Sequence, residues 1–274
     1  MLVSESFRYQ EVSGFKFGYS WIGRPKMFTH IYYVDGLLID TGQSRARKKI
    51  LEGTKALNID RIFITHHHED HSGNIKPLQK QHQCKAYASE LCCKLMKDPP
   101  RLSLVQKLTW GDREPSHDLT PVTHELRTPR FNFSLIPIPG HAPDMVALYE
   151  PERKWLFSAD LYINSYIGYF LKDEGILDQI ASLKKVLQLD FKVLFCGHNP
   201  QMKNAKQQLA QKLDFLETFY EKVVFQYSQG AVAQEILVRM QLKENRFVKI
   251  ASQGNLSKLN MVKSAIRDFE RQTP

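Results

Sequence analysis

The chain of 274 residues lacks several features that would place it in other broad protein classes. It contains no apolar run near the roughly 20 residues that a membrane-spanning helix needs, so we expect no membrane span. The N-terminus has neither a basic start with an apolar block nor a small-residue cleavage site, and we therefore expect a cytoplasmic protein. Internal repeats, low-complexity segments and a G-x-x-x-x-G-K-S/T loop are also absent, which excludes a P-loop nucleotide site.

Cysteine is scarce, with four residues at Cys84, Cys92, Cys93 and Cys196. None of them forms a C-x-x-C pair, and the neighbours Cys92 and Cys93 cannot easily bridge each other in regular structure. We expect reduced, partly buried thiols, as is usual in a reducing compartment.

Charge is unevenly placed along the chain, which has a formal net charge of +9. Residues 201–274 contain 12 Lys and Arg against 7 Asp and Glu. Such a basic segment can attract nucleic acid or anionic substrates, but it is also common on solvated helices. The charge alone leaves both interpretations open.

The order of predicted elements divides the chain near residue 200. Up to that point short apolar strands alternate with helices, the pattern of an α/β domain. We expect strands over 7–20, 31–34, 37–39, 61–65, 85–88, 131–138, 145–149, 155–157 and 191–196, and helices over 45–57, 72–82, 89–97 and 176–189. Beyond this point the apolar spacing predicts helices over 203–229, 231–240 and 256–269. We therefore predict a catalytic domain over 1–200 and an all-helical extension over 201–274, and we assign no chemistry to 101–130.

The stretch that follows the strand at 61–65 carries the strongest chemical signal. It reads His66-x-His68-x-Asp70-His71 and offers imidazole nitrogen and carboxylate oxygen, which zinc and similar ions accept. Alternating positions on an extended loop point His66 and His68 the same way, so His67 faces elsewhere. Because these ligands would crowd one tetrahedral centre, Asp70 and His71 are expected to serve a second ion nearby.

Two ions need more ligands than this loop contains. Three further candidates each follow a predicted strand: His141, Asp160 and His198. Sites at the carboxyl ends of strands are usual in α/β folds, and these three residues complete the set.

These seven residues resemble the pattern of the metallo-β-lactamase superfamily, which is H-x-H-x-D-H followed by a later His, an Asp and a final His. The resemblance extends over roughly residues 1–200 and implies a four-layer αββα sandwich, here with an α-helical C-terminal extension. It also implies one metal ion held by His66, His68 and His141, and another held by Asp70, His71 and His198, with Asp160 bridging the two. Asp40, in Asp-Thr-Gly, matches a position that in this family lies beside the site and orients the ligands.

Such a site implies hydrolysis. A water between two cations loses a proton near neutral pH and becomes a hydroxide nucleophile, while the metals polarise the scissile group. Asp70 would orient this hydroxide and shuttle its proton, which makes it the candidate catalytic residue. We expect two divalent metal ions per chain, zinc first, with iron and manganese as alternatives because all three occupy His/Asp sites.

The leading hypothesis is a metallo-hydrolase that cleaves a small-molecule ester, thioester or lactone. The alternative is a phosphodiesterase or endoribonuclease with the same metals, since the helical tail resembles that of small lactamase-like endoribonucleases and its charge suits RNA. A third hypothesis, a metal-binding protein with little activity, conflicts with the intact ligand set. The sequence leaves open the substrate, the oligomeric state, and whether the tail binds nucleic acid or only closes the pocket.

This sequence differs from two known branches of the superfamily, and the differences bear on which reaction is expected. Glyoxalase II-like thioesterases usually read Gly-His-Thr-x-Gly-His at the second motif, whereas Gly140-His141-Ala142-Pro143-Asp144 lacks the threonine and the second histidine. Glutathione thioester hydrolysis is therefore one option among several. The flavodiiron-type proteins carry Glu at the position of His68, so iron reduction chemistry is not expected.

Overall fold

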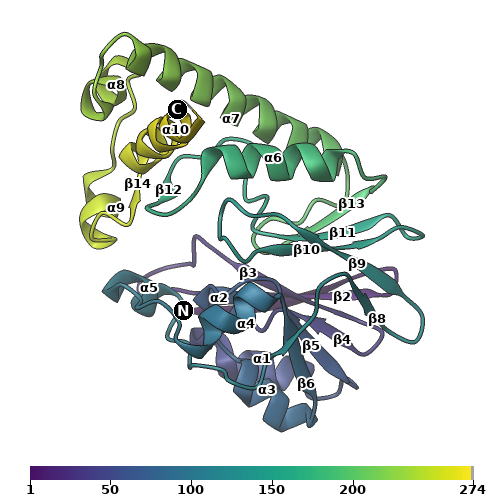
Figure 1. The fold of residues 1–274 in the computed structure, drawn as a ribbon. Helices are drawn as coiled ribbons and strands as arrows, with labels where there is room; N and C mark the ends of the chain where they lie inside the picture. Colours follow the sequence, from purple (N-terminus) through teal and green to yellow (C-terminus); the bar gives the residue numbers. More distant parts are fainter. Residues whose placement is uncertain (273–274) are drawn as a thin grey trace.

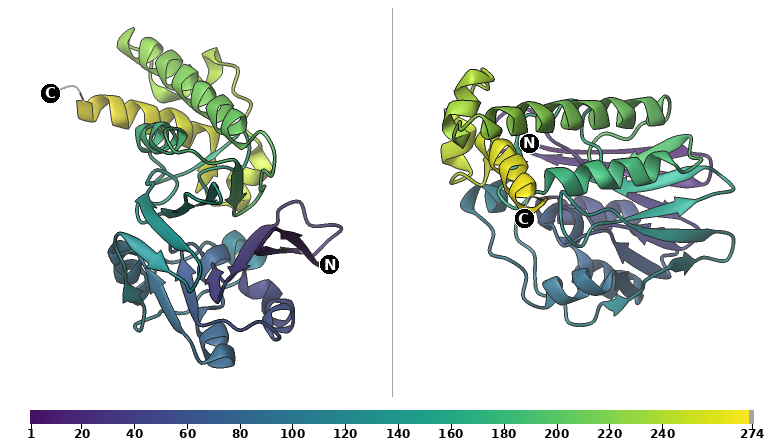
Figure 2. Two further views of the ribbon diagram at one scale, coloured as in Figure 1. Left: turned by 90° about the vertical axis from the view of Figure 1, so that its right-hand side faces the viewer. Right: turned by 45° about the horizontal axis from the view of Figure 1, so that its top comes forward.

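The computed structural model describes residues 1–272, apart from the side chains of residues 246, 247 and 251. Two mixed β-sheets face each other, and helices cover the outer face of each sheet (Figure 1). Residues 2–121 contain the strands of a seven-stranded sheet, and residues 125–196 contain those of a five-stranded sheet. The C-terminal helices lie on the outer side of the second sheet (Figure 2).

The first sheet follows the chain order. Its strands are β1 (Leu2–Tyr9), β2 (Val12–Tyr19), β3 (Thr29–Val34), β4 (Leu37–Ile39), β5 (Arg61–Ile64), β6 (Lys85–Ala88) and β7 (Thr120–Pro121). Neighbours are antiparallel up to β4 and parallel from β4 onward. The expectation of one strand over 7–20 was wrong, because Gln10 has a positive φ of 50° and reverses the chain between β1 and β2.

Helices pack on the outer face of this sheet. They are α1 (Arg47–Thr54), which follows the 3-10 turn η1 (Ser44–Ala46), α3 (Ile75–His82) and α4 (Glu90–Lys97). The short helices α2 (Glu69–Ser72) and α5 (Leu104–Thr109) instead contribute residues to a pocket described below. The Ser89 side chain accepts a hydrogen bond from the backbone of Cys92 and caps α4. All four cysteines are free, as expected.

The second sheet has the order β13 (Val193–Cys196), β11 (Trp155–Ala159), β10 (Val146–Glu150), β9 (Asn132–Pro137) and β8 (Glu125–Arg127). Strands β9, β11 and β13 point the same way, since β10 is antiparallel to both β9 and β11, and β11 is parallel to β13. Their carboxyl ends therefore meet at one edge of the sheet. Helix α6 (Ile176–Leu187) covers the outer face.

Strand alternation explains the four layers. In β4, Leu37 and Ile39 enter the core between the sheets while Leu38 packs toward the helices. In β11, Trp155 and Phe157 enter the same inter-sheet core while Leu156 faces the helices on the other side. Both strands are apolar on both faces, as a buried layer requires. The predicted αββα sandwich is confirmed.

The C-terminal segment contains α7 (Ala205–Ser228), α8 (Ala233–Arg239), α9 (Arg246–Ala251), β14 (Leu256–Ser257) and α10 (Lys258–Gln272). The all-helical expectation was wrong in one respect: β14 pairs antiparallel with β12 (Phe170–Leu171). Residues of α6, α7, α8 and α10 share one apolar core with the outer face of the second sheet. The domain division at residue 200 stays a prediction.

Among the described residues, no helix is both long and apolar enough to cross a membrane. The cytoplasmic location stays a prediction.

Candidate metal centre and adjoining pocket

The seven predicted ligand residues lie together at one edge of the two sheets. The 66–71 loop follows β5, and the other three residues, His141, Asp160 and His198, follow β9, β11 and β13. The backbone joins the sheets here: Val146 N donates to Thr65 O at 3.0 Å, and His30 N donates to Gly197 O at 2.7 Å. Strand direction therefore brings together residues that are far apart in the chain.

The first group consists of His66, His68 and His141, whose nitrogen atoms can converge on one ion. Nε2 of His141 lies 3.0 Å from Nδ1 of His68. Nδ1 of His66 lies 3.1 Å from the Thr65 hydroxyl, which leaves its Nε2 for the centre of the group. These three residues are the set that the resemblance assigned to one ion.

The second group consists of Asp70, His71, Asp160 and His198, with one ligand atom of each within 4.8 Å of the others. Asp160 contacts both groups: its Oδ2 lies 3.0 Å from His198 Nε2 and 3.4 Å from His141 Nε2, and its Oδ1 lies 3.2 Å from His71 Nε2. This position, between the two groups, is the one that a bridging carboxylate requires.

Asp40 lies beneath the centre and fixes its geometry. Its carboxylate accepts hydrogen bonds from the backbone and the hydroxyl of Thr65, each at 2.9 Å, and lies 2.7 Å from Nδ1 of His71. A carboxylate on one imidazole nitrogen leaves the other nitrogen free to bind a metal. Asp40 therefore orients His71 from the end of β4.

The residues present fit metal ions. Among the described residues, His66 Nε2 is buried without a hydrogen-bond partner, and His71 Nε2 and Asp160 Oδ1, which lie 3.2 Å apart, form no hydrogen bond either. A buried polar atom without a partner is costly unless something else binds it. Gly197 leaves room, because a Cβ at this position would lie 2.4 Å from Asp160 Oδ1. Imidazole and carboxylate donors suit zinc, iron and manganese.

The electrostatics agree with this fit. Burial lowers the pKa of His66 and His68 well below the usual value, which keeps both rings neutral. Burial acts in the same direction at His198, but the Asp160 carboxylate outweighs it and raises the pKa of His198 to about 9. Burial opposes ionisation of Asp160, yet His198 and His71 hold the pKa of this carboxyl well below its usual value. The second group therefore stabilises positive charge.

Two residues of the 66–71 loop, His67 and Glu69, point away from the centre, as was predicted for His67. Nδ1 of His67 lies 2.8 Å from Oδ1 of Asp144, and the His67 backbone donates to the same carboxylate. Glu69 forms a buried ion pair with Arg113 at 3.0 Å. Both residues brace the loop against neighbouring segments.

A pocket of about 290 Å³ opens over the candidate ligands. Its apolar walls are Met27, Val105, Trp110, Ile163, Tyr169, Leu171 and Leu256. The Trp110 ring lies 5.9 Å from that of His198. The sequence assigned no chemistry to 101–130, and in the structure α5 of this stretch forms one wall of the pocket. The local sequence feature that indicates helix α5 is the capping box of Ser103 and Gln106.

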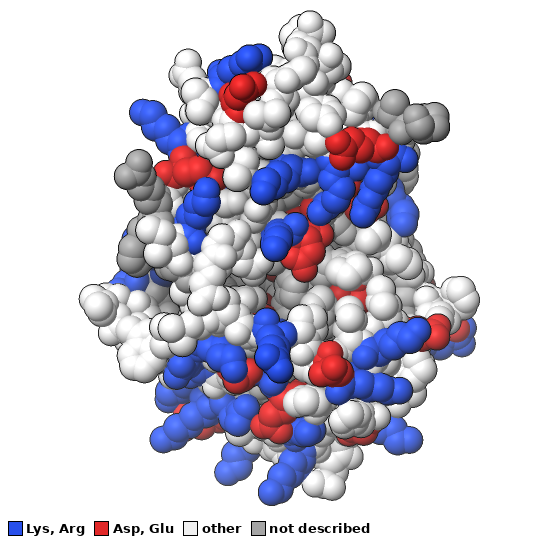
Figure 3. Space-filling model, turned by 60° about the vertical axis from the view of Figure 1, so that its left-hand side comes forward, with Lys and Arg blue, Asp and Glu red and all other residues white. Residues whose placement is uncertain are grey.

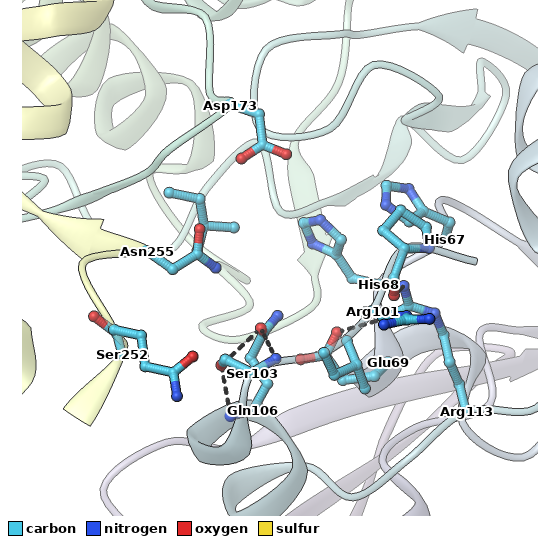
Figure 4. Close-up of a pocket in the computed structure, with 14 residues that line it drawn as sticks. His67, His68, Glu69, Arg101, Ser103, Gln106, Arg113, Asp173, Ser252 and Asn255 are labelled. Carbon is cyan, nitrogen blue, oxygen red and sulfur yellow. Dashed lines mark hydrogen bonds and ion pairs between the residues drawn. The ribbon is translucent and has the colours of Figure 1, made fainter. Parts of the chain in front are cut away.

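A second, more polar pocket of about 380 Å³ adjoins the first and shares His68, Ser103 and Leu171 with it. Figure 4 shows this pocket between α5 and the 252–255 segment, with Asp173 on a third side. Arg101 lines it, and in the described part of the chain the Arg101 guanidinium has no hydrogen bond or ion pair. The site thus combines an apolar space at the candidate ligands with a polar space beside it.

The family model described as the metallo-beta-lactamase superfamily matches residues 25–198. A hydroxyacylglutathione hydrolase of Idiomarina loihiensis is 24% identical over 236 residues, which cover 85% of this chain and 84% of that protein. One from Legionella pneumophila (strain Lens) is 25% identical over 71% of this chain and 67% of its own length.

Solved structures show the same fold. A metallo-beta-lactamase family protein from Thermus thermophilus has a TM-score of 0.69 at 17% identity, over 99% of this chain and 93% of its own. A beta-lactamase domain protein from Burkholderia ambifaria has a TM-score of 0.71 at 13% identity, over 97% of this chain and 89% of its own. These likenesses include the helical C-terminal segment.

Proposed function

Since the chain belongs to the metallo-β-lactamase superfamily, we propose that it is a hydrolase which uses two divalent metal ions to cleave a small ester, thioester or lactone. The observation that carries the proposal is the convergence of two groups of potential ligands, with the carboxylate of Asp160 between them. Relatives named hydroxyacylglutathione hydrolase support a thioester as the first substrate class to test.

Each residue has a proposed role. His66, His68 and His141 would hold one ion, Asp70, His71 and His198 the other, and Asp160 both. Bound ions of this kind supply Lewis acidity and lower the pKa of a coordinated water. Asp70 would also accept a hydrogen bond from the attacking water and so orient it, because its carboxylate lines the pocket. Trp110 and the other apolar walls exclude bulk water from the reacting bond.

The pocket favours a carbonyl compound over a phosphodiester. No Lys or Arg is among the described residues that line the space over the ligands. A nucleic-acid site normally presents several cations to the phosphate backbone. On the face shown in Figure 3, Lys and Arg side chains lie above and below a central hollow and are interspersed with Asp and Glu. The ribonuclease alternative therefore has the weaker support.

The adjoining polar pocket suits the other end of the substrate. An unpaired guanidinium at Arg101 can bind a carboxylate, and Ser103, Gln106 and Asn255 offer hydrogen bonds beside it. We therefore propose that an anionic or strongly polar end occupies this pocket while an apolar group lies over the metal centre.

A panel of substrates tests the proposal. Zinc-, iron- and manganese-loaded protein is assayed on an acyl thioester, a lactone, bis-p-nitrophenyl phosphate and single-stranded RNA. We expect metal-dependent cleavage of the thioester or lactone, which His68→Ala abolishes. His124→Ala is the matched control, because His124 is exposed and remote from the centre. Cleavage of RNA alone, falling steeply with salt, would favour the alternative, and full activity of His68→Ala would refute the proposed site.

A further inference from the structure

Glu174 is a buried carboxylate in the loop between β12 and α6, and it lines the metal-centre pocket. Its Oε1 lies 3.3 Å from Nδ1 of His141 and accepts a hydrogen bond from Leu171 N at 3.1 Å. Its Oε2 accepts from Gln179 Nε2 at 2.6 Å. Three partners therefore fix the orientation of this carboxylate.

The contact with His141 resembles the contact between Asp40 and His71. In both cases a carboxylate faces Nδ1, and Nε2 faces the candidate metal ligands. A carboxylate on Nδ1–H selects the tautomer whose lone pair is at Nε2 and holds the ring at one angle. His141 is thus presented to the first group of ligands by Glu174, just as Asp40 presents His71 to the second.

Helix α10 in turn holds the segment that carries Glu174. The main-chain oxygen of Glu174 accepts hydrogen bonds from the Ser264 hydroxyl and the Arg267 guanidinium, both at 2.7 Å. The Ser264 hydroxyl also accepts from Ile176 N, and the Asp268 carboxylate accepts from Leu177 N at 3.1 Å.

The three α10 residues can make these contacts together because of their spacing along the helix. Ser264, Arg267 and Asp268 are spaced i, i+3 and i+4 and therefore share one face of the helix. They satisfy backbone groups at the start of α6, where N–H groups lack helical partners. The views in Figures 1 and 2 agree that α10 lies beside α6.

We propose that Glu174 is a positioning residue for His141 and that α10 sets its position through Ser264, Arg267 and Asp268. The C-terminal segment is then a working part of the metal centre, in addition to forming a pocket wall. The inference rests on the proposed metal centre, and it assigns to the last helix a function at a site formed by residues 66–198.

Metal binding tests the inference without any substrate. Metal-free protein is titrated with zinc by calorimetry and with cobalt(II), whose visible absorption reports ligand geometry. We expect Glu174→Ala to weaken the binding of one of the two ions by about 10- to 100-fold, the usual effect of removing an outer partner of a ligand. The cobalt spectrum should change for this ion and stay the same for the other.

Further variants separate positioning from general damage. Glu174→Gln keeps the size of the side chain and should retain part of the affinity. Asp268→Ala, which removes the acceptor of the Leu177 N–H, should weaken the binding of the same ion by a smaller factor. Glu270→Gln, on the exposed side of the same helix, is the matched control and should bind both ions like the wild type. Thermal unfolding of each metal-free variant checks that it folds.

The results separate three questions: the positioning role of Glu174, the role of α10 and the proposed function. Wild-type binding of both ions by Glu174→Ala, with an unchanged cobalt spectrum, would refute the positioning role and leave the proposed hydrolase intact. An effect of Glu174→Ala without any effect of Asp268→Ala would refute the role of α10. Failure of the wild-type protein to bind metal ions would refute the proposed function and this inference together.

Discussion

Arg113→Met should destabilise the protein far more than the loss of one surface charge. Nη1 of Arg113 lies 3.0 Å from Oε2 of Glu69, and both side chains are only 3% exposed. Burial raises the pKa of Glu69 and lowers that of Arg113, so each ion depends on the other. Because Glu69 lies between two candidate ligands, the pair joins the 66–71 loop to the segment that forms the pocket wall.

The magnitude follows from this burial. Removing one partner of a buried pair leaves an uncompensated charge and costs about 3–5 kcal/mol. Replacing both partners by apolar side chains of similar volume is often close to neutral. Arg113 also donates to the Pro100 carbonyl at 2.9 Å, but Pro100 is exposed and water can take this place. We therefore expect the double variant Glu69→Met/Arg113→Met to recover to within about 1 kcal/mol of the wild type.

Urea unfolding of the metal-free protein measures these differences, since the extrapolated free energy of unfolding then contains no contribution from bound metal. Lys107→Met is the matched control: it breaks the pair with Asp112, whose two side chains are 46% and 62% exposed, and should cost less than about 1 kcal/mol. The reasoning fails if Arg113→Met costs no more than Lys107→Met, or if the double variant is as unstable as the single one.

Three other predictions concern the centre and its surroundings. Asp160→Ala should bind fewer than two ions and lose all hydrolysis, as measured by elemental analysis and rate assays; a full rate would exclude the bridging role. Chelation should lower the melting temperature, because metal at 1,000 times its Kd stabilises the folded state by about 4 kcal/mol; an unchanged melting temperature would contradict a metal site. Burial lowers the pKa of His30 to about 4. On acidification this ring therefore takes up a proton in the unfolded chain before it does so in the folded protein, and the free energy of unfolding falls as the pH drops from about 6.5 to 4. His30→Asn keeps a donor to the Gly197 carbonyl and should remove on the order of 3 kcal/mol of this loss of unfolding free energy, as measured by urea titrations at several pH values. If the unfolding free energy of the variant depends on pH as that of the wild type does, His30 is not the group responsible.

The candidate site was largely predictable because its residues follow strands. Residue type and place in the chain identified His141, Asp160 and His198, and strand direction then required them to meet at one edge. The alternation of strands and helices predicted an α/β domain, and the resemblance to the metallo-β-lactamase superfamily implied the four-layer sandwich. Their roles as metal ligands stay predictions until an ion is bound and measured.

The pocket walls were not predictable from local patterns. Helix α5 has six residues and buries none of its side chains fully, so it lacks the apolar periodicity by which helices are recognised. Strands β12 and β14 have two residues each and exist only because they pair with each other, and Leu171 and Leu256 of this pair line the pocket. Pairing between segments this far apart depends on the completed fold, and neither segment signals it alone.

The basic C-terminal segment illustrates why composition alone could not assign its role. On the sequence, its excess of Lys and Arg suited nucleic acid and solvated helices equally well. In the structure, Lys212 is buried and donates to the Leu161 carbonyl at 2.7 Å, and Arg267 donates to the Glu174 carbonyl. Lys212 and Arg267 thus hold the two ends of the segment from Leu161 to Glu174, and this segment contributes Tyr169 to the pocket. Cations with internal backbone partners are not free to bind a phosphodiester chain, so the role of at least these two is to fix the pocket wall.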